Sequence, residues 1–130
     1  MPFFAGNATL KTTVELTPEQ ASTLTFLRFQ PLGANSWRFR INGKPAGECL
    51  WGPYAVPVAG LLQPGPNEIE VELTMSLRNL LGPHHLEEGE SYAVNTMSFN
   101  KEPNFAGRKA PPYNAGYCFV ELGIKDIHLA

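Results

Sequence analysis

The stretch Trp37–Leu73, WRFRINGKPAGECLWGPYAVPVAGLLQPGPNEIEVEL, decides the fold. It opens with large apolar residues that alternate with arginines, which is the pattern of a strand with one buried face. Asn42 and Gly43 come next, and because both tolerate a positive φ they predict a tight hairpin turn and a short returning strand. A second turn over residues 61–67 leads into glutamates that alternate with apolar residues over 68–73. The stretch therefore predicts a meander of antiparallel strands.

Outside this stretch, four more segments have the composition or the alternation of strands. They are residues 8–16, 23–30, 92–99 and 117–129. In the first of them the alternate residues from Leu10 to Leu16 share one apolar face, and the last is expected to supply the closing strand or pair of strands. Twelve glycines and twelve prolines divide the chain into short runs, which is typical of an all-β protein.

Helical structure is expected only in short pieces. Thr17 has the character of a helix cap, because a proline and an acidic residue follow it at the first helical positions. Residues 76–82 predict one or two further turns, which end at a Gly-Pro pair. Residues 100–114 contain several prolines and predict a long loop, and loops of this length commonly carry function.

Length and charge limit the possible organisation and partners. The 130 residues, with a hydrophobic fraction of 43%, predict a single domain over residues 1–130 with one core. The net charge of −2 gives no electrostatic footprint for a nucleic-acid backbone, so no nucleic-acid partner is expected. No apolar run approaches the ~20 residues that span a bilayer, so no membrane partner is expected.

The charged residues and the cysteines have structural interpretations. The local positive charges are Arg28, Arg38, Arg40 and Lys44. The three glutamates that follow Asn67 balance them, which predicts pairing of charges across strands on a solvent-exposed face. Cys49 and Cys118 are expected to be free and mostly buried, and a single disulfide between them stays open as the alternative.

Three motifs resemble a known family. The N-G-K-x-x-G of residues 42–47, the Pro-Tyr pair at 53–54 and the L-L-x-P-G-x-N-x-I-x-V of residues 61–71 resemble the sugar-binding, jelly-roll domain of family 2 glycoside hydrolases such as β-galactosidases. The resemblance covers roughly residues 24–80 and rests on turn and core residues. It implies a galactose-binding-like jelly-roll β-sandwich of about eight antiparallel strands, and it says more about fold than about function.

The same resemblance implies a place in a larger protein. Residues 77–85 are similar to a stretch found in the C-terminal modules of multidomain bacterial polysaccharide-degrading proteins, so the chain is expected to be a module excised from such a protein. A secreted or periplasmic location follows if that is so, and the sequence otherwise leaves the location unknown. Galactose-binding-like domains often carry a structural calcium ion. Asp126 is the only aspartate here, so an Asp-rich calcium loop is missing and no cofactor is expected, with calcium kept as a possibility.

No catalytic or metal-binding constellation is found. His84 and His85 are adjacent, and adjacent residues of an extended chain point to opposite sides, so they are not expected to hold one ion together. No serine or cysteine has a motif that supplies a base and an orienting acid. Glycoside hydrolysis requires two carboxylates roughly 5–9 Å apart, whereas the glutamates of residues 87–90 indicate a solvated surface. In the resembling enzymes the catalytic acids lie on a separate barrel, so no enzymatic activity is expected of this chain.

Aromatic residues in loops, together with polar neighbours, indicate a carbohydrate site, because sugars stack their C–H faces on rings and hydrogen-bond through hydroxyls. The candidate ligand-binding residues are Trp51, Tyr54, Arg78, Asn79, His84, His85 and Tyr113. For Trp51 and Tyr54 the alternative is packing against the core or the edge of the sandwich.

The resemblance and these candidates together predict a non-catalytic carbohydrate-binding module of a glycoside hydrolase, with polysaccharide as ligand and the catalytic domain of the parent enzyme as partner. The alternative is a structural accessory domain that packs against that catalytic domain and binds no glycan. The sequence names neither the sugar nor the surface that would bind it.

Overall fold

The predicted meander is present in the computed structural model, which describes residues 3–82, 116–117 and 119–130. Strand β3 (Ser36–Ile41) leads into the turn at Asn42 and Gly43, whose φ angles are 51° and 76°, and β4 (Lys44–Cys49) returns beside it. Strand β6 (Gly65–Thr74) then pairs with the other side of β3. Both the hairpin and the strand after the second turn are therefore confirmed.

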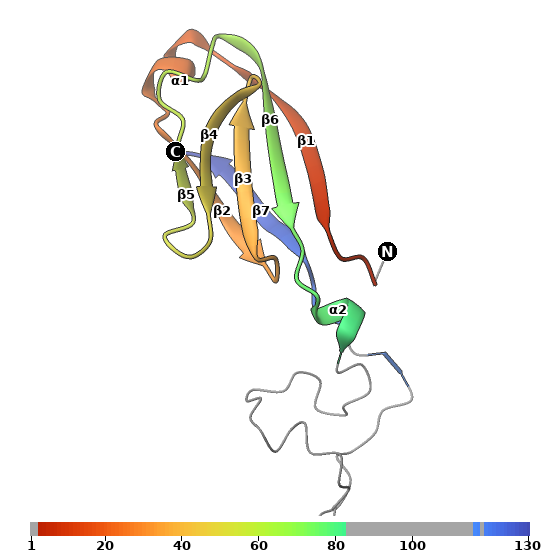
Figure 1. Cartoon of the computed structure of the whole chain (residues 1–130). Helices are drawn as coiled ribbons and strands as arrows, with labels where there is room; N and C mark the ends of the chain where they lie inside the picture. Colours follow the sequence, from red (N-terminus) through yellow and green to blue (C-terminus); the bar gives the residue numbers. More distant parts are fainter. Residues whose placement is uncertain (1–2, 83–115, 118) are drawn as a thin grey trace, which may run out of the picture. The chain divides into compact units, whose positions relative to one another are not determined.

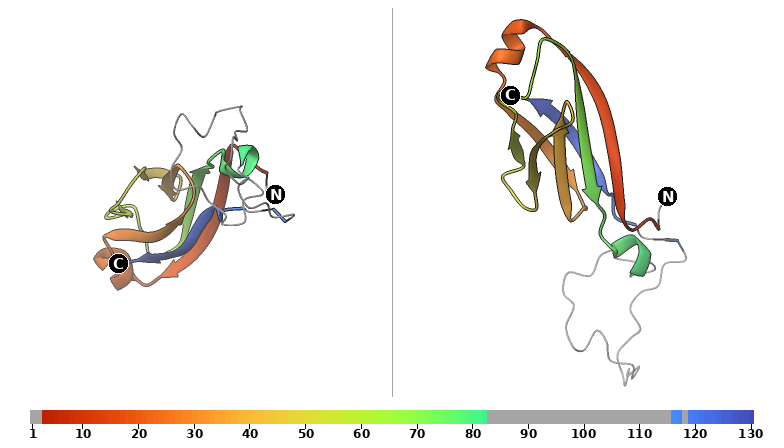
Figure 2. Two further views of the ribbon diagram at one scale, coloured as in Figure 1. Left: turned by 90° about the horizontal axis from the view of Figure 1, so that it is seen from below. Right: turned by 45° about the horizontal axis from the view of Figure 1, so that its top comes forward.

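The strands form two antiparallel sheets that enclose a common core (Figures 1 and 2). The four-stranded sheet has the order β1-β6-β3-β4, with β1 (Asn7–Leu16) at its edge. The three-stranded sheet has the order β5-β2-β7 and contains β5 (Ala55–Pro57), β2 (Phe26–Leu32) and β7 (Gly123–Leu129). The all-β sandwich is confirmed, with seven strands in the described residues against an expectation of about eight.

Three details of the strand prediction were wrong. The strand expected over residues 23–30 is β2 over Phe26–Leu32, because α1 extends to Thr23. Strand β5 has only three residues, too few for an alternation pattern to reveal it, and it was not predicted. The closing strand begins at Gly123 and not at residue 117, because residues 119–122 precede it without strand geometry. The predicted strand over 92–99 and the predicted loop over 100–114 lie outside the described residues.

The core is built from the inward-facing residues of both sheets. Its buried members are Leu27, Phe29, Trp37, Phe39, Ile41, Cys49, Val56, Val58, Ile69, Val71 and Leu73. The indole Nε1 of Trp37 donates a hydrogen bond of 3.1 Å to the carbonyl of Gly123, so the one polar atom of this buried ring has a partner. Burial of these side chains is the main source of stability, since each large one contributes about 1.5–3 kcal/mol.

A bulge in β7 sets which of its residues face outward. Gln30 of β2 lies opposite Asp126, but Pro31 lies opposite Ile124, so Lys125 is an extra residue without a partner across the pair. The bulge lets Ile124 and Ile127 both pack against the core although they are three residues apart. Proline is tolerated at such a point because it has no N–H to give to the ladder.

Helix α1 (Pro18–Thr23) starts as predicted at Thr17. The Thr17 hydroxyl accepts a hydrogen bond of 3.2 Å from the Gln20 amide, and the Gln20 side chain accepts one of 2.9 Å from the Thr17 amide. This reciprocal capping satisfies two backbone donors that a helix start would otherwise leave without partners. None of the helices in the described part of the chain is long and apolar enough to cross a membrane.

By their internal contacts the residues divide into two compact units. The sandwich unit comprises Ala5–Ser76 and Glu121–Ala130, and the smaller unit comprises Met1–Phe4 and Leu77–Val120. In the described part of the smaller unit, α2 (Arg78–Leu81) confirms the predicted helical turn. A single domain over residues 1–130 stays a prediction.

Candidate functional site

The loop between β4 and β5 presents an exposed tryptophan on a fixed base. The side chain of Trp51 is 71% exposed, the largest exposure among the aromatic residues that the structure describes. Behind it, the ring of Tyr54 packs edge-on against the core, with centroids 5.5 Å from Phe29 and 5.7 Å from Trp37. At the start of the loop, Cys49 is buried, and its Sγ lies 3.8 Å from the carbonyl oxygen of Ala55.

This arrangement separates the roles of the two predicted aromatic residues. Tyr54 packs against the core, as the alternative interpretation expected, and it positions the loop. Trp51 turns its ring to solvent, and a large planar ring held at the surface is the type of platform on which the apolar face of a sugar stacks. Leu50 beside it is also exposed, so the loop tip has an apolar surface of two residues.

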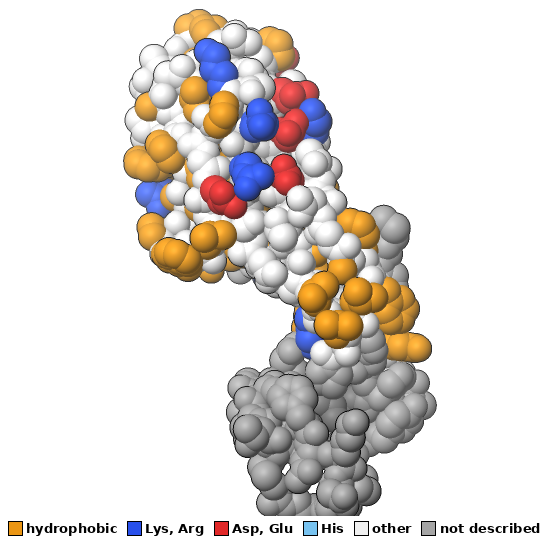
Figure 3. Space-filling model, in the orientation of Figure 1, with side chains coloured by type: hydrophobic (Ala, Val, Ile, Leu, Met, Phe, Trp, Pro, Cys, Tyr) orange, Lys and Arg blue, Asp and Glu red, His pale blue; other side chains and the backbone are white. Residues whose placement is uncertain are grey.

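The outer face of the four-stranded sheet is covered with paired charges (Figure 3). Lys11 lies 2.6 Å from Glu70, Arg38 bridges Glu48 and Glu72 at 3.4 and 3.7 Å, and Arg40 lies 3.9 Å from Glu70. The predicted cross-strand charge pairing is therefore confirmed for Arg38 and Arg40. The hydrogen bond to Glu70 and the charges of Glu68 and Glu70 raise the pKa of Lys11, as expected for an amine among carboxylates.

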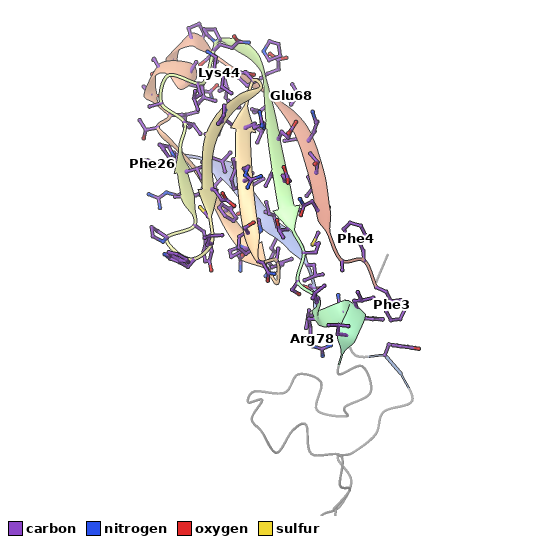
Figure 4. The ribbon with its side chains drawn as sticks, in the orientation of Figure 1. Phe3, Phe4, Phe26, Lys44, Glu68 and Arg78 are labelled. Carbon is purple, nitrogen blue, oxygen red and sulfur yellow. The ribbon has the colours of Figure 1, made fainter. Side chains whose placement is uncertain are left out.

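The outer face of the three-stranded sheet is different, and the sequence did not predict it. Five exposed side chains from two strands lie on it, and we call them the Arg28 face: Phe26, Arg28, Gln30, Asp126 and His128. Arg28 was expected to pair with the glutamates after Asn67, which was wrong, because those glutamates belong to the other sheet. Figure 4 places Phe26 at the side of the sandwich, beside β5.

The inner side of β1 is largely uncovered. Leu10 faces inward beside Val71 of β6, yet it is 49% exposed. Among the described residues, β7 is the last strand of the facing sheet, so no strand beyond it covers Leu10. An apolar groove results between the two edge strands. It is lined by aliphatic residues that include Leu10, Ile69, Val71, Ile124 and Ile127.

Two of the predicted ligand-binding residues belong to the smaller unit. Asn79 is buried and uses both ends of its amide on one partner: its Nδ2 donates to the carbonyl of Val120 at 2.8 Å, and its Oδ1 accepts from the amide of Val120 at 2.9 Å. Its role in the structure is to fasten α2 to that segment. Arg78 is half-buried in the first turn of α2.

Phe3, Tyr117 and Phe119 form an aromatic cluster in the same unit, with ring centroids 5.0–5.4 Å apart (Figure 4 labels Phe3 and Arg78). The remaining predicted site residues, His84, His85 and Tyr113, lie outside the described residues, and their roles stay predictions.

No group of three His, Cys, Asp or Glu side chains that fits a metal ion occurs in the part of the chain that the structure describes. A structural calcium ion stays a possibility raised by the sequence. Cys49 is a free and buried thiol, as predicted, while Cys118 lies outside the described residues.

Comparison with known proteins supports the fold. No family model and no curated protein sequence matches the chain. The structure is similar to part of the β-glucuronidase of Ruminococcus gnavus. In the complex of that enzyme with uronic isofagomine, the TM-score is 0.50 at 20% identity, over 55% of this chain and 13% of the enzyme. In its complex with D-glucaro 1,5-lactone, the TM-score is 0.50 at 18% identity, over 56% of this chain and 13% of the enzyme. The chain thus matches a small part of a longer protein, and the resemblance to a sugar-binding-like sandwich of family 2 glycoside hydrolases is confirmed at the level of the fold.

Proposed function

We propose that this chain is a non-catalytic carbohydrate-binding module of a glycoside hydrolase. The observation that carries the proposal is the exposed indole of Trp51, held on a loop whose base is anchored by Tyr54. The ring is in water in the folded and in the unfolded chain, so it adds little to stability, and it is available to stack on the apolar face of a sugar. The fold supports the proposal because it is shared with part of a β-glucuronidase, although a fold alone does not define a function.

The proposed binding mode is stacking of one sugar ring on Trp51, with the edge of the loop contributing hydrogen bonds. Because a single exposed ring covers only part of a sugar, most of the ligand stays in water, and the affinity is expected to be weak, on the order of micromolar to millimolar per site. The catalytic groups of the parent enzyme then lie elsewhere in that protein. A secreted or periplasmic location belongs to the same proposal.

The test is affinity gel electrophoresis of the whole chain against pectins, xylans, mannans, β-glucans and galactans. The proposal expects that one class of polysaccharide retards the chain and that Trp51→Ala abolishes the retardation. Leu50→Ala is the matched control, because it removes another exposed apolar side chain from the same loop without removing a ring. Retardation that survives Trp51→Ala would reject Trp51 as the platform, and a lack of retardation by every polysaccharide would reject glycan binding.

A second candidate function is a structural module that packs against the catalytic domain of the parent enzyme. The uncovered inner side of β1 favours it, because the apolar groove around Leu10 is a surface that proteins seldom leave in water. This function predicts unchanged migration in every gel. It also predicts that Leu10→Asp weakens the association of the chain with that catalytic domain. Thr9→Asn, a change at an exposed position of β1 that does not line the groove, is expected to have little effect.

A further inference from the structure

We propose that the Arg28 face is a second binding site, which takes the carboxylate of an acidic sugar. The site is independent of Trp51, because it consists of side chains on the outer face of the three-stranded sheet and not of the loop between β4 and β5. It therefore goes beyond a module that binds a neutral glycan by stacking alone.

The first argument is that Arg28 lacks the partners that the other arginines of the sandwich unit have. Arg38 and Arg40 each lie within 4 Å of glutamate oxygens on the four-stranded sheet. Among the described residues, the side chain of Arg28 makes no hydrogen bond and no ion pair, although its backbone is paired in the sheet. A guanidinium has five N–H donors in a planar fork, which matches the two oxygens of a carboxylate.

The second argument is that the guanidinium of Arg28 lies beside an aromatic ring on the same strand. Its Cζ lies 5.9 Å from the centroid of the Phe26 ring, the distance of a cation–π contact. A cation–π contact consumes none of the N–H donors of the guanidinium, so these stay available to a ligand. Because β2 is the central strand of its sheet, the backbone below both residues is paired on two sides and fixed.

The neighbouring side chains fit the rest of a sugar ring. His128 lies directly opposite Arg28 in the sheet, and Asp126 lies opposite Gln30, so the four polar side chains share one surface. The imidazole Nδ1 of His128 is 3.7 Å from a carboxylate oxygen of Asp126. Together these groups offer donors and acceptors for hydroxyls, and Phe26, 42% exposed, adds an apolar surface for C–H groups.

The mixture of charges favours an acidic sugar over an acidic peptide. Asp126 repels a chain that carries carboxylates at every residue side by side, and Arg28 is the only arginine on this face to offset it. A uronic acid presents one carboxylate together with several hydroxyls, which matches one guanidinium flanked by Gln30, Asp126 and His128. The face is open, so it suits a unit within a polysaccharide chain.

The test is isothermal titration of the whole chain with a tetramer of galacturonic acid and with its fully methyl-esterified form. The proposal expects binding of the acidic tetramer, and binding of the ester that is weaker on the order of tenfold or more, because the ester cannot accept a charge-assisted bidentate bond. Arg28→Gln is expected to weaken binding of the acid by a similar factor. Arg38→Gln is the matched control, an exposed arginine on the other sheet, and is expected to leave binding unchanged.

Several results would overturn the proposal. Equal binding of acid and ester would show that the carboxylate is not recognised, and equal binding by the wild type and Arg28→Gln would place the site elsewhere. Equal or tighter binding of a hexaglutamate peptide, lost in Arg28→Gln, would assign the face to acidic peptides instead. If Arg28→Gln changes the circular dichroism spectrum, Phe26→Ala and His128→Gln take its place, and full binding by both would reject the face. Loss of neutral-glycan binding in Trp51→Ala would concern the site at Trp51 and is independent of the Arg28 face.

Discussion

Asn42 and Asn67 join the two turns of the meander through a side-chain hydrogen bond: the Nδ2 of Asn42 donates to the Oδ1 of Asn67 at 2.9 Å. Asn67 is completely buried, and its amide also accepts from the Gln63 amide at 2.9 Å and donates to the Gln63 carbonyl at 2.7 Å. Asn42 in turn accepts from the Glu68 amide at 2.9 Å. The hairpin turn and the turn before β6 are thus one hydrogen-bonded assembly.

Replacing Asn67 is expected to be strongly destabilising. Asn67→Ala removes the partners of backbone groups in the turn and of Asn42, and the loss of several bonds made by one fully buried side chain costs about 3 kcal/mol in the free energy of unfolding. The measurement is the urea midpoint followed by circular dichroism. Asn7→Ala, which removes an exposed side-chain bond to Glu72, is the control and is expected to cost less than about 0.5 kcal/mol. Similar midpoints for the two variants would contradict the assembly.

The sequence predicted the meander well because its signals are local. Local signals at Asn42 and Gly43 and the alternation through Leu73 depend only on neighbours in the chain, and both follow from backbone preferences. The short strand β5 and the start of β7 at Gly123 depend on pairing with β2, which is distant in sequence. Such boundaries are set by tertiary contacts and therefore escaped prediction.

The candidate site shows the same limit. Trp51 and Tyr54 were both selected as aromatic residues of a loop, but only the structure distinguishes the exposed ring from the packed one. The Arg28 face joins β2 to β7, and the position of a bulge at Lys125 decides that Asp126 and His128 lie outward. No pattern within either strand alone reveals that pairing, and composition could not tell which sheet Arg28 occupies.

Gly33 is expected to tolerate no side chain. Its φ of +35° disfavours other residues, and an added Cβ would lie 2.5 Å from the carbonyl oxygen of Glu121 and 2.8 Å from a methyl group of Leu122. Gly33→Ala combines backbone strain with a clash against backbone, for an expected cost of about 3 kcal/mol. Gly60→Ala is the control, since Gly60 has φ of +76° but open space around it, and backbone strain alone costs about 1 kcal/mol. Equal losses of melting temperature in the two variants would contradict the close approach at Gly33.

The two tryptophans are expected to differ in fluorescence. Trp37 is 3% exposed and Trp51 is 71% exposed, so iodide, a charged quencher, reaches only the second. Trp51→Phe is expected to shift the emission maximum to shorter wavelength and to remove most of the quenching, since the remaining indole lies in the core. A Stern–Volmer titration of the wild type and this variant measures the difference. Quenching that persists in Trp51→Phe at the wild-type level would show that Trp37 is accessible.

Cys49 is expected to make stability fall at alkaline pH. Burial raises the pKa of the Cys49 thiol, and the weak hydrogen bond with the Ala55 carbonyl does not reverse this. Below the pKa of the thiol in the unfolded chain, about 8.5, both states keep the proton and Cys49 adds no pH dependence. Above it the unfolded chain loses the proton while the folded one retains it. Deprotonation then lowers the free energy of the unfolded state alone, so the free energy of unfolding declines until the pH reaches the raised pKa of the folded state.

Urea unfolding at pH 7 to 10 tests this expectation in the background of Cys118→Ser, which leaves Cys49 as the only thiol. The free energy of unfolding is expected to decrease with pH more steeply when Cys49 is present than in the Cys49→Ala, Cys118→Ser double variant, whose remaining decline comes from other groups. Alkylation by iodoacetamide at pH 8 gives a second measure, because the thiolate is the reactive form and the folded protein holds little of it. Parallel pH profiles, together with alkylation as fast in buffer as in urea, would show that the Cys49 thiol ionises as it does in water and that the buried loop base opens freely.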